Sequence, residues 1–423
     1  MLNSVRLENV GPADQLGPVD FAPRVNFITG DNGLGKSFLL DIGWWALTRN
    51  WARRAIAVPR SGGRKKAKIG YSYSKRTSGD FEDTVEFNKS QQIWPTKPGR
   101  PPIPGVVVYA GVDGGFSVWD PSRNYWADKD ASVLRPTSFD FSSQEVWNGL
   151  RGEDGTLYCK GLIQDWVLWQ QSQSENFSDL EKVLASLSPS DHEQITPGKP
   201  VRFGIDATDY PTLKMPYGET VALIHASAGM RRICALAYLL VWTWNEHIEA
   251  SRRLGRQPAK EVIFLVDEIE CHLHPQWQRR IVPALLSVMM SLTKKRVPVQ
   301  LIIATHSPLV LASTEVIFDE DKDKILTLSL HGSEVRIEER TASVQGSVSN
   351  WLVSEAFGLM QARSIEAEKA IEVAEKWMRG QRTELPPDLN TKKKIHAALL
   401  ASLRGGDEFW PRWIVKTDQV PKN

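Results

Sequence analysis

The chain is poor in the features that build disulfide-bonded, zinc-binding or membrane-spanning proteins. Its three cysteines, Cys159, Cys234 and Cys271, are scattered, and none belongs to a Cys-x-x-Cys pair. Neither a disulfide framework nor a zinc knuckle is therefore expected. The longest mostly apolar run, residues 233–244, is too short to cross a bilayer, and the first residues lack the apolar core of a signal peptide. We expect a cytoplasmic protein with no membrane role.

Net charge is also nearly absent. The 52 basic and 50 acidic residues leave a formal charge of +2, so the chain as a whole has no electrostatic attraction for nucleic acid. Neither an internal repeat nor a sustained heptad pattern is evident, which argues against solenoids and long coiled coils. A hydrophobic content of 41% and a charged content of 24% are typical of a soluble globular protein. The length of 423 residues predicts two or three domains, or one domain with a large insertion.

A glycine-rich loop is the most informative feature that is present. Residues 30–37 read Gly-Asp-Asn-Gly-Leu-Gly-Lys-Ser, between a β-prone run at 25–29 and a helix-compatible apolar run at 38–47. Strand, loop and helix in this order predict a phosphate cradle rather than a chance glycine turn, because loop N–H groups and the helix N-terminus attract an anion. Lys36 would reach the β- and γ-phosphates of a nucleotide, and Ser37 would bind Mg²⁺. The predicted nucleotide contacts are Gly30, Asn32, Gly33, Gly35, Lys36, Ser37 and Phe38.

A second pattern places two carboxylates at the end of a buried strand. Residues 262–266 form an uninterrupted apolar run that is followed by Asp267 and Glu268. Such a run predicts a parallel strand that is buried on both faces. Asp267 would be an oxygen ligand of Mg²⁺, and Glu268 would accept a proton from an attacking water. A strand that merely ends in solvent-facing acids is the alternative for a pattern this short.

A third apolar run, at residues 301–304, ends in Thr305 and His306. A histidine after a strand is usually structural, but here a predicted helix at 276–292 separates the two acid- and histidine-ending strands. This β-α-β spacing brings both strand ends to one edge of a parallel sheet. We therefore expect His306 to donate a hydrogen bond to the γ-phosphate.

Taken together, these segments resemble ABC-type ATPases of the branch that contains RecF, the SMC proteins and the overcoming-lysogenization-defect ATPases. Residues 30–37 resemble the Walker A loop, residues 262–268 Walker B, and residues 305–308 the switch-histidine loop. Residues 270–275 resemble the acidic segment, ending in His-Pro, that follows Walker B in this branch. The resemblance implies an α/β fold, in which a head with a mixed β sheet core and helices binds ATP and Mg²⁺.

The resemblance also implies a signature segment at a helix start between Walker A and Walker B. Residues 226–230, Ala-Ser-Ala-Gly-Met, stand in that region and differ from Leu-Ser-Gly-Gly-Gln at the first, third and fifth positions. Ser227 and Gly229 keep the hydroxyl and the open backbone that would bind the γ-phosphate held by a second copy. Arg231 or Arg232 is a candidate to replace the missing glutamine. The implied assembly is a head-to-tail homodimer, or a higher oligomer, that ATP joins and hydrolysis releases.

The implied head spans residues 1–345, and its insertion between Walker A and the signature covers about residues 50–200. Residues 346–423 are expected to form a helical C-terminal tail that docks a partner. Within the insertion, helical spacing of apolar residues runs through 143–187, and residues 201–205 are expected to form a strand.

The length of the insertion, the diverged signature and the tail look most like the PtuA ATPases of Septu-type and retron-linked antiphage systems. Such ATPases act with a separate nuclease, so the resemblance implies an ATP switch that controls an effector nuclease subunit. A RecF-type repair or recombination ATPase is the first alternative; a PARIS-type AriA sensor ATPase and a transporter nucleotide-binding subunit are weaker ones. No nuclease of its own is expected, because the Asp-x-Asp pattern in residues 318–323 has no other metal-site elements around it.

Two features remain open. Residues 53–76 carry many basic residues and no acidic one, which fits either contact with a DNA or RNA backbone or a solvated hairpin. The glutamine that the family places near the nucleotide is not identified, and Gln91, Gln92 and Gln144 are candidates.

Overall fold

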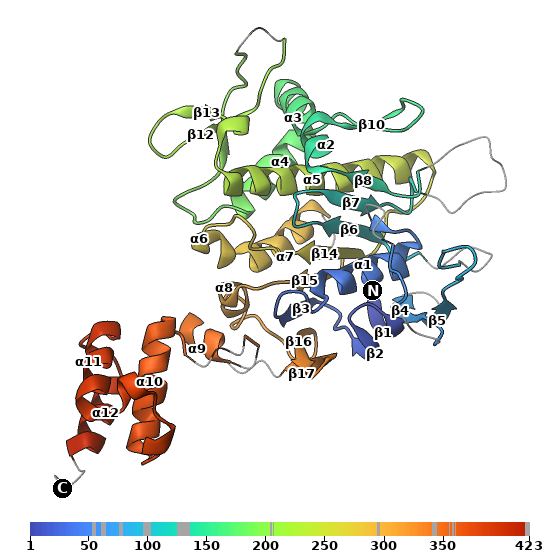
Figure 1. The fold of residues 1–423 in the computed structure, drawn as a ribbon. Helices are drawn as coiled ribbons and strands as arrows, with labels where there is room; N and C mark the ends of the chain where they lie inside the picture. Colours follow the sequence, from blue (N-terminus) through green and yellow to red (C-terminus); the bar gives the residue numbers. More distant parts are fainter. Residues whose placement is uncertain are drawn as a thin grey trace. The chain divides into compact units, whose positions relative to one another are not determined.

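Figure 1 shows the computed structural model, which describes residues 1–52, 56–60, 65–75, 79–95, 103–124, 136–203, 205, 207–293, 297–340, 345–354, 356–357, 359 and 361–418. The chain folds into two compact units, Met1–Gly346 and Ser347–Asn423.

An eight-stranded sheet in the order β17-β16-β3-β15-β14-β6-β7-β8 forms the centre of the first unit. Its strands are β3 (Val25–Gly30), β6 (Val106–Ala110), β7 (Phe116–Trp119), β8 (Phe139–Phe141), β14 (Val262–Asp267), β15 (Val299–Ala304), β16 (Asp323–His331) and β17 (Glu334–Arg340). The five strands from β16 to β6 are parallel, and the outer ones pair antiparallel. The continuous apolar sequences of β14 and β6 fit this position, because both are buried along their whole length. The carboxyl ends of β3, β15, β14 and β6 therefore meet at one edge of the sheet.

A second, antiparallel sheet has the order β2-β1-β4-β5. Its strands are β1 (Leu2–Val10), β2 (Ala13–Asp20), β4 (Lys68–Lys75) and β5 (Gly79–Glu86). One hydrophobic cluster joins this sheet to helix α1 (Lys36–Thr48) and to the main sheet; Trp45 of α1, Tyr71 of β4 and Ile302 of β15 all belong to it. Burial of these apolar side chains holds α1, and with it the glycine-rich loop at its start, against the core.

Most of the remaining elements of the first unit lie between residues 143 and 312, in the insertion and in the segments that connect the later strands. The elements are α2 (Ser143–Asn148), β9 (Leu150–Arg151), β10 (Leu157–Cys159), α3 (Leu162–Gln171), α4 (Glu175–Ser186), β11 (Thr196–Pro197), β12 (Thr212–Lys214), β13 (Thr220–Ala222), the 3₁₀ turn Leu223–His225, α5 (Ala228–Arg253), α6 (Pro275–Gln278), α7 (Ile281–Leu292) and α8 (Pro308–Ala312). Helix α5 is the longest of these, and its middle is buried on all sides, which explains the apolar run at 233–244.

Three local expectations need correction. The helical stretch expected at 143–187 is interrupted by the short hairpin β9–β10, because Gly149 and Gly155 both adopt positive φ angles there. Among residues 201–205, the described ones, which leave out 204, form only a single bridge, between Val201 and Tyr210, rather than a strand. The helix expected at 276–292 is two helices, α6 and α7, with a break at residues 279–280.

The second unit is helical. It contains α9 (Val348–Val353), α10 (Ile365–Met378), two 3₁₀ turns (Arg382–Glu384 and Pro387–Leu389), α11 (Lys392–Ser402) and α12 (Phe409–Asp418). A hydrophobic cluster of its own, with Ile371, Leu399, Trp410 and Trp413 among its members, gives this unit a separate core. In both units, no described helix is long and apolar enough to span a membrane.

Candidate active site

The glycine-rich loop lies between β3 and α1 at the carboxyl edge of the main sheet. Gly30, Gly33 and Gly35 all have positive φ angles, which glycine adopts without steric cost. Gly30 is also required for space, because an added Cβ would lie 2.3 Å from the Leu328 carbonyl oxygen of the neighbouring strand. Gly35 is the N-cap of α1 and has no side chain to cap the helix. The first N–H groups of α1 are therefore left for another acceptor, such as a phosphate.

Lys36 is buried at the base of this loop. Its Nζ donates to the carbonyl oxygens of Gly30 and Asp31, each at 2.8 Å. Burial lowers the pKa of the Lys36 ammonium, while the nearby carboxylates of Glu268 and Asp267 act in the opposite direction. The ammonium group is thus held between the loop and the end of β14, where a bound phosphate would meet it.

Ser37 and Asp267 are brought together by the packing of α1 beside β14. The Ser37 hydroxyl donates to Asp267 Oδ1 at 2.9 Å, and Asp267 is almost fully buried. A hydroxyl and a carboxylate at this separation are oxygen donors of the kind Mg²⁺ prefers. The donor set therefore fits a Mg²⁺ ion shared between the start of α1 and the end of β14.

Glu268 follows Asp267 in an unusual backbone conformation. Its φ angle is +47°, a left-handed value that costs a non-glycine residue roughly 1 kcal/mol or more. The chain turns sharply here, and the Glu268 carbonyl accepts from the Cys271 N–H at 2.9 Å. The turn ends β14 and leaves the Glu268 side chain only partly buried, beside Lys36. Strain of this kind collects at functional sites.

His306 lies at the same sheet edge, just beyond β15, the neighbour of β14. Its main-chain N–H donates to Glu270, which also accepts from the Thr305 hydroxyl at 2.7 Å. Glu270 therefore ties the segment after Walker B to the switch loop. Sequence reasoning noted the acidic segment but missed this role, which only the adjacency of β14 and β15 reveals.

The signature segment forms the start of α5. Ser227 is the N-cap of the helix and is exposed, and its hydroxyl accepts from the Met230 N–H at 3.3 Å. Gly229 is buried against the segment after Walker B, since an added Cβ would lie 2.8 Å from the His272 carbonyl oxygen. The residues placed around Lys36 come from the glycine-rich loop and the end of β14, whereas Ser227 faces solvent.

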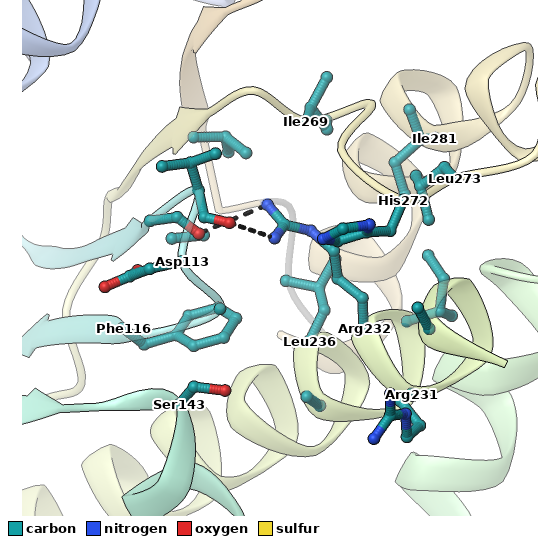
Figure 2. Close-up of a pocket in the computed structure, with 18 of the residues that line it drawn as sticks. Asp113, Phe116, Ser143, Arg231, Arg232, Leu236, Ile269, His272, Leu273 and Ile281 are labelled. Carbon is teal, nitrogen blue, oxygen red and sulfur yellow. Dashed lines mark hydrogen bonds between the residues drawn. The ribbon is translucent and has the colours of Figure 1, made fainter. Parts of the chain in front are cut away.

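The two arginines of the signature helix differ. Arg231 is exposed, but the guanidinium of Arg232 points toward the turn between β6 and β7, as Figure 2 shows. There it donates to the Val112 carbonyl oxygen at 2.9 Å and the Gly111 carbonyl oxygen at 3.4 Å. Arg232 lines a cavity of about 280 Å³ together with Phe116 and other side chains. Of the two, only Arg231 remains a candidate for replacing the signature glutamine.

Of the three candidate glutamines, only Gln144 follows a strand of the main sheet: α2 begins just after β8, which runs parallel to β6 and ends at the same edge. Gln91 and Gln92 are exposed in a turn between Asn88 and Ile93, and Gln144 is exposed in the first turn of α2. The turn at residues 111–115, which follows β6 beside Walker B, lies at this edge as well, next to Ser143 of α2, and its sequence Gly-Val-Asp-Gly-Gly contains no glutamine.

Most described side chains of the basic segment are paired. Arg60 and Lys65 contact Asp14, Lys66 contacts Glu86, and Lys68 contacts Glu8; Arg53, Arg54, Arg64 and Arg76 lie outside the described residues. The Lys68–Glu8 pair joins β4 to β1, and the other pairs join the segment before β4 to β2 and β5. They favour a solvated hairpin over a surface that binds the backbone of a nucleic acid.

The Asp-x-Asp pattern is part of a polar turn. Asp323, the first residue of β16, is buried against Arg24, whose Nε donates to Asp323 Oδ1 at 2.8 Å, and Asp319 pairs with Lys322. Within the described parts of the chain, no group of three or more His, Cys, Asp or Glu residues is arranged to hold a metal ion.

Comparison with known proteins gives matches to ATPases. The family model described as "AAA domain, putative AbiEii toxin, Type IV TA system" matches residues 160–312. The Retron Ec83 probable ATPase of Escherichia coli is 31% identical over 99 residues, which are 23% of this chain and 15% of that protein. The Retron Vc95 probable ATPase of Vibrio cholerae serotype O1 biovar El Tor is 45% identical over 152 residues, 36% of this chain and 24% of that protein. The chain thus matches less than a quarter of the length of either relative.

Among solved structures, the SMC head domain from Thermotoga maritima aligns with 81% of this chain and 99% of its own, with a TM-score of 0.37 and 14% identity. The Smc head bound to the C-winged helix domain of ScpA aligns with 81% of this chain and 98% of its own, with a TM-score of 0.42 and 13% identity.

The family match and the two retron relatives confirm the resemblance to ATPases, and among them to ATPases linked to retrons. The expected fold is also confirmed: an α/β P-loop head with a mixed sheet and helices, followed by a helical C-terminal region.

Proposed function

We propose that this protein binds ATP with Mg²⁺, hydrolyses it, and uses the cycle as a switch in the cytoplasm. The observation that carries the proposal is the cluster of Lys36, Ser37, Asp267 and Glu268 at one edge of a parallel sheet. These four residues come from two segments that are more than 200 positions apart. A buried ammonium, two magnesium-type ligands and a strained glutamate together match what phosphoryl transfer to water needs.

The side chains divide the chemistry between them. The loop N–H groups and Lys36 hold the β- and γ-phosphates, so charge that develops on them is stabilised by donors already in place. Ser37 and Asp267 would hold Mg²⁺, which neutralises phosphate charge when bound. Glu268 takes a proton from the attacking water, and His306 hydrogen-bonds the γ-phosphate from the adjacent strand end.

A second copy of the chain would complete the site. Ser227 caps α5 at an exposed position, and the free N–H groups of a helix start favour an anion. In a head-to-tail dimer, or a higher oligomer built from it, this helix start would meet the γ-phosphate held by the other copy's Lys36. ATP would then join the two heads, and hydrolysis would release them.

We further propose that the switch controls a separate effector in antiphage defence, with a nuclease subunit as the partner. The support is the likeness to two proteins named as retron ATPases. The helical second unit, which has its own hydrophobic core, is the proposed docking element for that partner.

The test of the enzymatic proposal is a comparison of nucleotide binding and phosphate release in the purified protein. Mg²⁺-dependent ATP turnover that Glu268→Gln suppresses while ATP binding persists would support the assignment. Normal turnover in that variant would show that Glu268 is not the base. Wild-type protein that neither binds nor hydrolyses ATP would refute the proposal as a whole.

A further inference from the structure

Arg232 connects the signature helix to the main chain of the proposed catalytic base. Besides its contacts with Val112 and Gly111, its Nη2 donates to the Glu268 carbonyl oxygen at 3.4 Å. We propose that Arg232 is a positioning residue that fixes the backbone, and through it the carboxylate, of Glu268. The inference rests on the proposed function, since it assigns a role within that ATPase site.

The geometry of the contacts suits a guanidinium group. All three acceptors are main-chain carbonyls, two in the turn after β6 and one at the end of β14, and these two strands are parallel neighbours. A planar fork with several N–H donors can bridge such carbonyls at once, whereas a lysine ammonium offers a single point of contact. The shortest of the three bonds is the one to the Val112 carbonyl oxygen, at 2.9 Å. The loop at residues 111–115 thus holds the guanidinium in place, and the same group also donates to the Glu268 carbonyl oxygen.

Glu268 has a specific need for such support. Its left-handed φ angle of +47° is a conformation that persists only where surrounding contacts determine it. Among the described residues, the Glu268 carbonyl oxygen accepts hydrogen bonds only from the Cys271 N–H and from Arg232. A general base acts only when its oxygen lies within hydrogen-bond reach of the water, so small rotations of this backbone change the rate.

The position of Arg232 in α5 adds a consequence. It lies five residues after Ser227, on the helix whose buried Gly229 packs against the His272 carbonyl. The start of α5 therefore meets the end of β14 through Arg232 and the segment that follows β14 through Gly229. A displacement of the signature helix would therefore move the backbone of Glu268.

A cavity of about 280 Å³ beside Arg232 gives the proposal an unusual test. Its walls include Phe116, Trp147, Leu236, Ile269 and Leu273, and Figure 2 shows the guanidinium among the residues that line it. Removal of the Arg232 side chain would enlarge this space. A small guanidinium compound from solution could then occupy the place of the missing group.

The first experiment compares kcat, KM and ATP affinity of Arg232→Ala, Arg232→Lys and the control Arg253→Ala in the full-length protein. Arg253 lies on the same helix but is exposed and pairs only with Glu249 in the described structure. We expect kcat of Arg232→Ala to fall by about tenfold to a hundredfold, the scale of a base displaced by about 1 Å, with ATP affinity and KM unchanged. Lysine should restore part of the rate, and the control should match the unsubstituted protein.

The second experiment separates positioning of Glu268 from a structural role in the turn after β6. On a Glu268→Gln background, Arg232→Ala should lower the residual single-turnover rate no further, because both changes act on one group. In Arg232→Ala alone, millimolar ethylguanidinium should raise kcat several-fold, whereas ethylammonium at the same concentration should not.

Wild-type kcat in Arg232→Ala, or an equal loss of rate on the Glu268→Gln background, would overturn the role. So would a loss of ATP affinity in Arg232→Ala that matches its loss of kcat, since that would place the effect on folding or binding. Absence of ATP turnover in the unsubstituted protein would refute the proposed function itself, and this role with it.

Discussion

The glycine-rich loop and the signature helix start form two halves of the proposed nucleotide site that differ in how completely they are built. At the loop, Lys36 is buried and bonded to two carbonyls, and Ser37 is bonded to Asp267. At the helix start, Ser227 is exposed and its hydroxyl accepts one helical N–H. The first half is held in place by its own chain, and the second faces outward. This difference between a buried half and an exposed half supports the proposal that a second copy completes the site.

Removal of the lysine should have the largest effect. Lys36→Ala deletes the buried cation of the cradle, so we expect ATP affinity to fall by about a hundredfold to a thousandfold, the scale of one partner lost from a buried charge pair. Titration with a fluorescent ATP analogue measures this, with Lys322→Ala, in an exposed ion pair, as the control. Affinity within a few-fold of the unsubstituted protein would show that the loop is not the cradle.

Substitution of the base should separate binding from chemistry. Glu268→Gln keeps the shape of the side chain but cannot take a proton, so turnover should fall by about a hundredfold or more while ATP binding persists. Phosphate release and nucleotide binding are measured on the same sample. A variant that hydrolyses ATP at the normal rate would move the role of base to another group.

Substitution at the helix start should damage turnover but spare the first half-site. Ser227→Arg adds a long side chain at an exposed cap, where a lost cap costs about 1 kcal/mol of stability, so the head should still fold and bind ATP. We expect turnover to fall at least tenfold because the second copy can no longer close on the γ-phosphate. Equal turnover in variant and parent would mean that the signature does not take part.

Much of this site could be predicted from the sequence, because short stretches of sequence determine it. Each of its main features depends on only a few neighbouring residues. The glycines at 30, 33 and 35 allow the turn of the loop, Lys36 stands beside them, and the apolar run before Asp267 specifies a buried strand. The turn after β6 and the tie between Glu270 and the switch loop could not be predicted, because both depend on which strands are neighbours. The break between α6 and α7 was also missed, since apolar spacing continues through it.

The second unit offers a contrast in stability. Trp413 is fully buried, and its indole N–H donates to His396 at 3.0 Å, so Trp413→Ala should destabilise this unit by about 3–5 kcal/mol. Because the first unit has a separate core, ATP turnover of the head should stay unchanged. Limited proteolysis combined with an ATPase assay tests both statements, and a parallel loss of turnover would show that the units do not act independently.

Reversal of the basic segment should have the smallest effect. Lys65, Lys66 and Lys68 already contact carboxylates, and exposed pairs of this kind contribute only about 0–1 kcal/mol each. Replacing all three with glutamate should leave ATP turnover unchanged and produce no loss of DNA binding in a salt titration. DNA affinity that falls steeply with salt in the parent and disappears in the variant would favour the RecF-type alternative.

The most direct test of the account mixes two inactive variants. Lys36→Ala keeps an intact signature and Ser227→Arg keeps an intact cradle, so a mixed head-to-tail dimer would contain one complete site. We predict that each variant alone turns over ATP at least about tenfold more slowly than the unsubstituted protein. An equal mixture should regain up to about a quarter of the normal turnover, because about half of its dimers are mixed and each of these has one complete site of two. Mixed dimers that form, as shown by differently tagged copies, yet remain inactive would contradict the claim that two copies share one nucleotide.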